Sequence, residues 1–249
     1  MTHEQGPDSD TQLDPTQDTC QSLLQRRRDA ITRLALLTTH GLTKQSAHCL
    51  LRLFTSSDFI WTARTMGVPI PTASQLDDQV VAAIVDLHGL RTTTPHNAMI
   101  FFHPVSEGGL GFTSATAVRA GALAASWSFC LSDVLAATGF ADLLDLAFHA
   151  PPLQPPLRLT QRLHEELFEA QSVVNLPLPP HDVPRQRAFT QMAIKHSIAQ
   201  WNGHPTVTPA DSAWRLSCGA PMGAPGFSSH PPHATICLTR FSTFASALG

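Results

Sequence analysis

The amino-acid sequence predicts an all-α fold, an irregular helical array with long connectors rich in proline and glycine. Apolar residues recur at spacings of three and four in most segments, which gathers them on one face of a helix. No segment shows the sustained alternation of apolar and polar residues that marks a half-buried strand. Twenty prolines and fourteen glycines punctuate the helical segments and account for the connectors.

The first helix is predicted to follow a disordered N-terminus. Residues 1–16 are polar and acidic, a composition that cannot bury enough apolar surface to fold. Asp18 or Thr19 can cap a helix there, and Gly41 is a natural C-terminal stop. Apolar residues between these signals share one helical face.

Two more helices are predicted in the following segment. Thr43 can cap the second helix, and Ser57 or Asp58 can begin a short third helix that ends near Gly67. A Val-Pro pair follows, and the residue before a proline is biased away from helical angles. The sequence therefore predicts two separate helices between the glycine stops.

A fourth amphipathic helix is predicted to begin at Thr72 or Ser74, to run through Leu87 and to be closed by Gly89. Its apolar residues keep the three- and four-residue spacing of a half-buried helix. The segment after it has the composition of a loop, in which 98–102 could form a short strand or helix.

The most informative stretch runs from His103 to Trp127. A Gly-Gly-Leu-Gly turn at 108–111 precedes a helix of small residues, predicted from Ser114 to Ala137 and ended by Gly139. The glycines permit a sharp turn, and the alanines allow neighbouring helices to approach closely. An anion could sit before such a helix, but the lysine of a phosphate-binding loop is missing, so we interpret the stretch as a packing device.

Four prolines between residues 151 and 156 form a stiff connector that predicts a subdomain boundary. We therefore divide the chain into a tail at 1–16, a helical region at 17–150 and a second helical region at 151–249. Further helices are predicted at about 143–147, 159–173, 185–201, 210–216 and 238–248.

Charge and cysteine content narrow the possible functions. The net charge of −3 counts against strong autonomous binding of nucleic acid, although a local basic patch remains possible. Five widely spaced cysteines are typical of reduced intracellular thiols. The N-terminus lacks a secretory signal, and no run of about 18 apolar residues predicts a membrane span. We expect an intracellular protein, cytoplasmic or nuclear, with no membrane partner.

Basic residues in the N-terminal helices are the candidates for binding RNA or DNA. Three adjacent arginines fan around more than half of a helix, so at least one points into solvent and one flanks the apolar face. An ordinary solvated face explains such residues equally well. The candidate nucleic-acid-binding residues are Arg26, Arg27, Arg28, Lys44 and Arg52.

No motif predicts a metal, a cofactor or a catalytic residue. Two cysteines and two histidines between 218 and 237 lack the short ligand spacing of a structural zinc site. Asp77 and Asp78 fall in a helical pattern and are interpreted as surface charges. Phe140-Ala141-Asp142 resembles half of a polymerase carboxylate turn, but Leu143 replaces the second carboxylate that two-metal phosphoryl transfer needs.

Several short motifs follow one another along the chain in a fixed order. They are a paired-leucine helix, a Gln-x-Ala-x-x-Leu-Leu-Arg helix, an arginine before a proline, an Asp-containing helix, the Gly-Gly-Leu-Gly turn with its Ala-Ser-Trp helix, an Ala-x-x-Ala-Trp-Arg-Leu-Ser segment and a terminal Leu-Gly. This order resembles the region downstream of the polymerase palm in non-LTR retrotransposon reverse transcriptases. The similar segments are 23–41, 45–53, 59–69, 76–87, 103–127, 210–218 and 241–249.

The resemblance implies a thumb and helical linker that pack on template and primer, with the five basic residues facing nucleic acid. Fingers, palm and catalytic carboxylates are missing, so the chain looks like a truncated fragment that does not polymerise. Weak RNA or DNA binding is the leading hypothesis. A helical protein–protein module is the alternative, favoured by low charge and exposed proline-rich connectors. An enzyme with a His/Asp site assembled in space has no supporting spacing.

Overall fold

The computed structural model describes residues 15–90, 95–168, 176, 178, 182–205 and 207. Helices and turns make up these residues, and no strand occurs among them, which confirms the all-α prediction. Residues 1–14 of the tail expected at 1–16 lie outside the described residues, whereas residues 15 and 16 already belong to the first helix. The helices expected at 210–216 and 238–248 and the cysteine–histidine group at 218–237 also lie outside the described residues.

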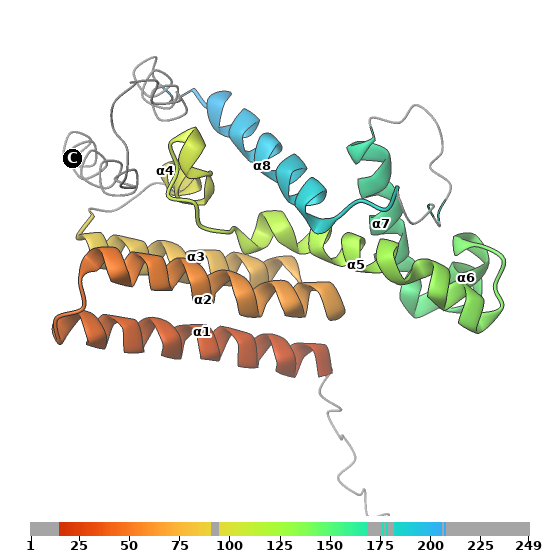
Figure 1. The fold of residues 1–249 in the computed structure, drawn as a ribbon, viewed down its shortest axis with the longest axis horizontal. Coiled ribbons are helices and arrows are strands. Elements are labelled where there is room, and N and C mark those ends of the chain that lie inside the picture. The colour runs from red at the N-terminus through yellow and green to blue at the C-terminus, as the bar shows by residue number, and fades with distance from the viewer. Residues whose placement is uncertain are drawn as a thin grey trace, which may run out of the picture.

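Three antiparallel helices form one side of the fold, and α5 begins next to α2 and α3 and extends past their ends (Figure 1). They are α1 (Pro15–Thr39), α2 (Lys44–Thr65) and α3 (Ile70–His88). The Thr43 hydroxyl caps α2 by accepting a hydrogen bond from the Ser46 amide at 3.1 Å, as the sequence predicts. Gly89 ends α3 in the left-handed region, at a φ of 66°.

The second helix is longer than expected. The sequence predicts a break at Ser57 or Asp58, but α2 runs without interruption through both positions. Thr55 and Ser56 donate their hydroxyls to the carbonyls of Leu51 and Arg52, at 2.7 and 3.1 Å. These side chains therefore bond back within the helix instead of capping a new one.

The glycine turn is built by close backbone contact, after α4 (Pro95–Met99) and two short 3₁₀ turns, η1 (Ile100–Phe102) and η2 (Val105–Glu107). Gly108 and Gly111 have φ values of 78° and 72°, which favour glycine. A Cβ on Gly109 would lie 2.1 Å from the His103 carbonyl oxygen. The interpretation as a packing turn is therefore confirmed.

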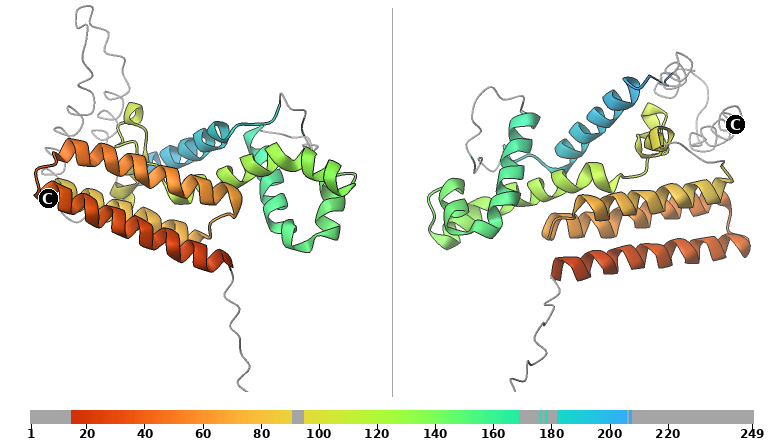
Figure 2. Two further views of the ribbon diagram at one scale, coloured as in Figure 1. Left: turned by 60° about the horizontal axis from the view of Figure 1, so that its bottom comes forward. Right: turned by 180° about the vertical axis from the view of Figure 1, so that it is seen from behind.

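The small-residue helix, α5 (Ala115–Thr138), is the centre of the molecule and packs against α2, α3, α7 and α8. Ser114 caps it and Gly139 ends it, as predicted. A Cβ on Gly121 would lie 2.6 Å from the Cβ of Phe189, so α5 and α8 cross at a point where only glycine fits. Figure 2 shows from two further sides that α5 lies between the three N-terminal helices at one end and α6 and α7 at the other.

The four prolines between residues 151 and 156 do not form the stiff connector that the sequence predicts. They lie in a 3₁₀ turn, η3 (Pro151–Leu153), and in the first turn of α7 (Gln154–Leu167). Proline fits there because the first amides of a helix have no partner within it. The remaining described helices are α6 (Leu143–His149) and α8 (Gln186–Asn202).

Side chains from both sides of residue 150 share cores. Leu131, Leu146 and Leu157 are fully or almost fully buried in one cluster, which joins α5, α6 and α7. Phe189 of α8 packs in another cluster with Ala124 of α5. The proposed boundary therefore crosses packed hydrophobic clusters.

Helix α5 is also, by length and composition alone, apolar enough to span a membrane. The sequence analysis predicts no such segment. Helices α2, α3, α7 and α8 pack against α5, and 39% of its most apolar 18-residue window is buried inside the described structure.

Candidate functional site

The three adjacent arginines of α1 point in different directions, and Arg27 points inward. Only 5% of Arg27 is exposed, and its guanidinium donates hydrogen bonds to the carbonyls of Thr55 on α2 and Leu76 on α3. Arg27 therefore ties three helices together. The expectation that Arg27 faces nucleic acid is corrected, because its donors are buried and engaged.

Arg26 and Arg28 are both exposed, on opposite flanks of α1. Successive residues turn by about 100°, so these two side chains leave the helix about 200° apart. Arg33 follows Arg26 by seven positions and shares its flank. The exposed arginines of α1 consequently form two separate surfaces rather than one patch.

Lys44 and Arg52 are exposed on α2, and the structure does not bring them together with the arginines of α1 into one cluster. Lys44 lies at the start of α2, and Arg52 borders a cavity on the side that faces the glycine turn. The predicted set is therefore distributed over the helix pair.

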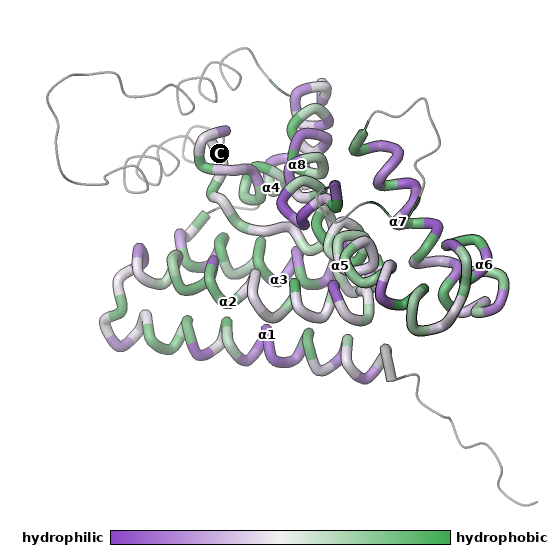
Figure 3. Tube along the Cα trace, turned by 45° about the vertical axis from the view of Figure 1, so that its right-hand side comes forward, coloured by the Kyte–Doolittle hydropathy of each residue, from purple (hydrophilic) through white to green (hydrophobic). Residues whose placement is uncertain are grey.

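The α1–α2 pair is nevertheless basic within an acidic chain. Residues 15–65 carry seven Lys and Arg against three Asp, whereas the whole chain has a net charge of −3. Hydrophilic residues recur along α1 (Figure 3). On α2 the indole of Trp61 is 66% exposed, so one face of the ring is open to solvent.

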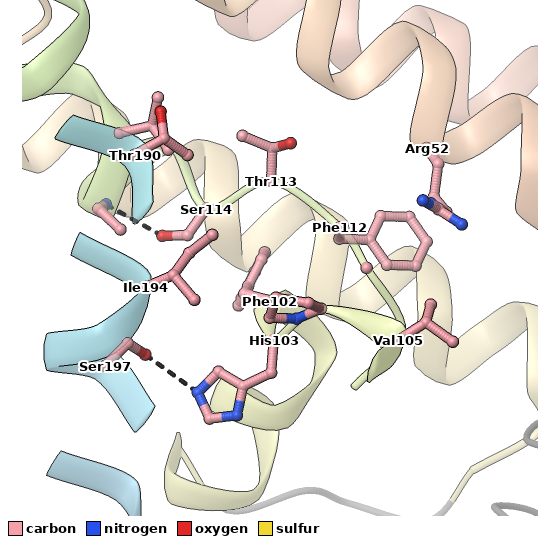
Figure 4. Close-up of a pocket in the computed structure, with 14 residues that line it drawn as sticks. Arg52, Phe102, His103, Val105, Phe112, Thr113, Ser114, Thr190, Ile194 and Ser197 are labelled. Carbon is pink, nitrogen blue, oxygen red and sulfur yellow. Dashed lines mark hydrogen bonds between the residues drawn. The ribbon is translucent and has the colours of Figure 1, made fainter. Parts of the chain in front are cut away.

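A second candidate site is a cavity of about 320 Å³ between α8 and the segment that leads into α5 (Figure 4). Its apolar wall includes Phe102, Val105, Phe112, Val118 and Ile194. Its polar side chains come from three regions of the sequence and are Arg52, His103, Thr113, Ser114, Thr190 and Ser197.

A buried histidine joins the two sides of this cavity. His103 is 1% exposed, and its Nε2 lies 3.1 Å from the Ser197 hydroxyl on α8. The His103 ring also meets the Trp201 ring edge to face, with centroids 6.2 Å apart. The contact positions α8 over the glycine turn, so the cavity depends on residues 94 positions apart.

Arg52 lies at the margin of the cavity, beside the Phe112 ring (Figure 4). Its Nη2 would be 3.1 Å from a Cβ added to Gly111, so the guanidinium covers the glycine backbone. Within the described part of the chain, Arg52 has no carboxylate partner. A cation at the edge of a partly apolar cavity can pair with an anionic ligand.

Asp77 is not the surface charge that the sequence analysis predicts. Its carboxylate accepts hydrogen bonds from the Ser114 hydroxyl at 2.8 Å and from the amides of Ala115 and Thr116 at 2.6 and 3.0 Å. It therefore occupies the N-terminus of α5 and ties α3 to it. Burial raises the pKa of Asp77, against the opposing effect of these hydrogen bonds. Asp78 is exposed, as predicted.

Asp142 also has a structural role. Its Oδ1 accepts a hydrogen bond from the Asp145 amide at 2.9 Å and caps α6. The likeness of residues 140–142 to a polymerase turn is thereby explained as a helix cap.

Two buried histidines are held neutral. Burial, with the nearby positive charges of His88 and Arg52, lowers the pKa of His48 to about 4. Burial lowers the pKa of His164 to about 4 as well. His164 Nε2 lies 2.5 Å from the Ser128 hydroxyl, which itself donates to the Ala124 carbonyl. The Ser128 hydroxyl is buried, and its proton is donated to the Ala124 carbonyl. The Ser128–His164 pair therefore stabilises helix packing and does not form a nucleophile.

Among the described residues, no three metal-ligating side chains gather into a site that could hold an ion. Sequence reasoning found the basic helices and the glycine turn. It missed the cavity, because His103, Thr190 and Ser197 become neighbours only when α8 packs on the turn. No family model, curated protein or solved structure matches this chain.

Proposed function

We propose that this chain is a non-catalytic helical module that binds single-stranded RNA or DNA weakly through the α1–α2 pair. The observation that carries the proposal is a basic helix pair with an exposed indole, Trp61. The sequence resemblance to the thumb and linker of a retroelement reverse transcriptase supports the same function. We infer from that resemblance that the chain is related to the thumb and linker region of such an enzyme.

Phosphates and bases would be bound by different side chains. The exposed guanidiniums of Arg26 and Arg33, on one flank of α1, suit phosphate oxygens. Trp61 suits a base, since stacking on an aromatic ring tolerates any sequence. Arg27 contacts Thr55, and α1 and α2 are antiparallel. Along the axis of the pair, Trp61 therefore lies about 8 Å from Arg26 and about 18 Å from Arg33. A strand of a few nucleotides covers these distances.

Affinity is expected to be low and dependent on salt. Few cations are exposed on each surface, and the whole chain is negatively charged at neutral pH. Each phosphate contact on a single strand contributes about 0.7 to the slope of log K against log salt. Two arginines therefore account for a slope of about 1.4, beside any other contacts.

Fluorescence anisotropy with a labelled oligouridine of about 16 nucleotides tests this proposal between about 50 and 200 mM salt. Replacing Arg26 and Arg33 together by alanine should lower the salt slope by about 1.4. Trp61→Ala should weaken binding about tenfold and leave the slope unchanged. Arg158→Ala, an exposed arginine on α7, is the matched control. Equal binding by all four proteins would refute the proposal.

An apolar patch on α6, formed by Leu144 and Phe148, favours the alternative, a protein-interaction module. Phe129 on α5 and Leu144 and Phe148 on α6 are 72%, 72% and 76% exposed. Leu144 and Phe148 are four residues apart, so they share one face of α6. We propose a second copy of this chain as the occupant, because a two-fold axis places the same apolar patch on both sides of an interface.

Light scattering on the eluted protein at micromolar concentration tests the dimer. The unchanged chain should elute as a dimer, and Phe148→Asp should elute as a monomer. Leu36→Asp on α1, at a side chain 57% exposed, is the control and should remain dimeric. A monomer at all concentrations would exclude the proposed dimer.

The free cysteines agree with a reducing compartment. Cys20, Cys49 and Cys130 are unpaired thiols, and two of them are exposed. Exposed thiols persist where glutathione keeps them reduced. We therefore propose a cytoplasmic or nuclear location.

A further inference from the structure

The cavity between α8 and the glycine turn has a composition suited to a small ligand. Its volume of about 320 Å³ is at the lower end of the range for small-molecule sites, about 300–1,000 Å³. Phe102, Val105, Phe112, Val118 and Ile194 provide an apolar wall. Such walls favour a compact apolar body, which would displace water from the cavity.

We propose that this cavity binds a small carboxylic acid whose apolar body lies against this wall and whose carboxylate pairs with Arg52. The nucleic-acid surface proposed above uses Arg26, Arg33 and Trp61, whereas this site uses Arg52, on the side of α2 that faces the glycine turn. Arg52 is the cationic side chain among the lining residues, and no Asp or Glu lines the cavity in the described structure. A planar guanidinium pairs with a carboxylate through two parallel hydrogen bonds.

The charges at the two ends of the lining segment fix the orientation of the ligand. Arg52 covers Gly111, whereas Ser114, three residues later, donates its hydroxyl to Asp77. Ser114 also accepts from the Ala117 amide, so its hydroxyl is fully engaged. A ligand carboxylate near Ser114 would meet the negative charge of Asp77. The anion therefore belongs at the Arg52 end.

Two threonines supply further hydrogen bonds. Thr113 and Thr190 border the cavity from different elements, one before α5 and one on α8 (Figure 4). Neither hydroxyl is engaged by another described side chain, whereas Ser197 already contacts His103 at 3.1 Å. A hydroxyl or carbonyl on the ligand can bond to either threonine. Both groups would otherwise lose hydrogen bonds to water when an apolar body enters.

Saturation-transfer NMR and titration with phenylacetate, a carboxylate with an apolar ring, test the proposal on the full chain. Phenylacetate should bind saturably, and phenylacetamide, which has the same shape without the charge, should bind at least about tenfold more weakly. Equal affinity for the two compounds would overturn the assignment of Arg52. Failure of phenylacetate to saturate would overturn the site.

Two variants test separately the charge of Arg52 and the shape of the cavity. Arg52→Met keeps the aliphatic stem and should weaken phenylacetate about tenfold without changing the affinity for phenylacetamide. Ala117→Leu fills the cavity from α5 and should abolish binding of both compounds. Arg158→Met, on α7 and away from the cavity, is the matched control.

Circular dichroism confirms that each variant is folded before its affinity is compared. If Arg52→Met or Ala117→Leu binds phenylacetate like the unchanged chain, the ligand lies elsewhere and the proposal is wrong. The Arg26 and Arg33 double variant should retain phenylacetate binding, so a failure of nucleic-acid binding is distinguishable from a failure of this site.

Discussion

At the residue scale, neighbouring side chains with the same chemistry have opposite roles. Arg27 is buried among three helices and donates to two carbonyls, whereas Arg28, the next residue, is exposed. A helical period of 3.6 residues separates their directions by about 100°. The sequence pattern predicts this divergence and also identifies the inward arginine, because position 27 lies four residues from both Leu23 and Ile31 on the apolar face of α1.

Arg27→Ala should lower the free energy of unfolding by about 2–4 kcal/mol, because two buried carbonyls lose a charged donor and a space opens between helices. Urea denaturation followed by circular dichroism measures the change. Arg28→Ala, at the exposed neighbour, should stay within about 0.5 kcal/mol of the unchanged chain. Similar losses in both variants would contradict the structural role of Arg27.

Gly109→Ala should destabilise the protein by more than about 2 kcal/mol, since its Cβ would overlap the His103 carbonyl. Gly203→Ala is the control, because the nearest atom to its Cβ would be 3.5 Å away. Thermal melts of the two variants compare them directly. A Gly109→Ala protein as stable as the control would mean that the turn relaxes.

At the element scale, helix stops were predictable and helix starts were less so. Gly89 and Gly139 end their helices because glycine adopts the left-handed conformation that closes a helix. By contrast, Ser57 has the residue type of a cap but lies within α2. The hydroxyls of Thr55 and Ser56 donate to carbonyls within α2. Packing of α2 against its neighbouring helices therefore outweighs the preference of Ser57 for a capping position. The cavity was unpredictable because it joins elements distant in sequence.

Asp77→Ala should cost about 1–2 kcal/mol, because the amides that begin α5 lose their acceptor and the helix dipole loses a negative charge. Chemical denaturation at neutral pH measures the effect. The neighbouring Asp78→Ala removes an exposed charge and should have little effect. Equal effects would show that Asp77 does not support α5.

At the scale of the whole molecule, buried neutral histidines make stability depend on pH. His48 and His164 have pKa values of about 4, against 6.5 for an unperturbed imidazole. Below pH 6.5 the unfolded chain therefore binds more protons than the folded chain. The stabilisation that the two neutral histidines give the folded chain is complete above pH 6.5 and is lost as the pH falls through 4.

We expect the free energy of unfolding to fall between pH 6.5 and pH 4, by up to about 3 kcal/mol for each histidine. Urea titrations across this interval measure the slope. His164→Gln keeps a polar group without an imidazole and should flatten the curve, relative to the exposed control His149→Gln. A pH-independent stability would contradict the assignment of buried neutral imidazoles.

The central position of α5 has a consequence for synthesis on the ribosome. Three of the four hydrophobic clusters include successive parts of this helix, at Ala115–Ala122, at Ala124 and Ala125, and at Leu131 and Leu135. Helices α1, α2 and α3 leave the exit tunnel first, with part of their apolar surface still without its partner. A nascent chain stalled before residue 115 would offer that surface to a chaperone, whereas emergence of α5 would withdraw it.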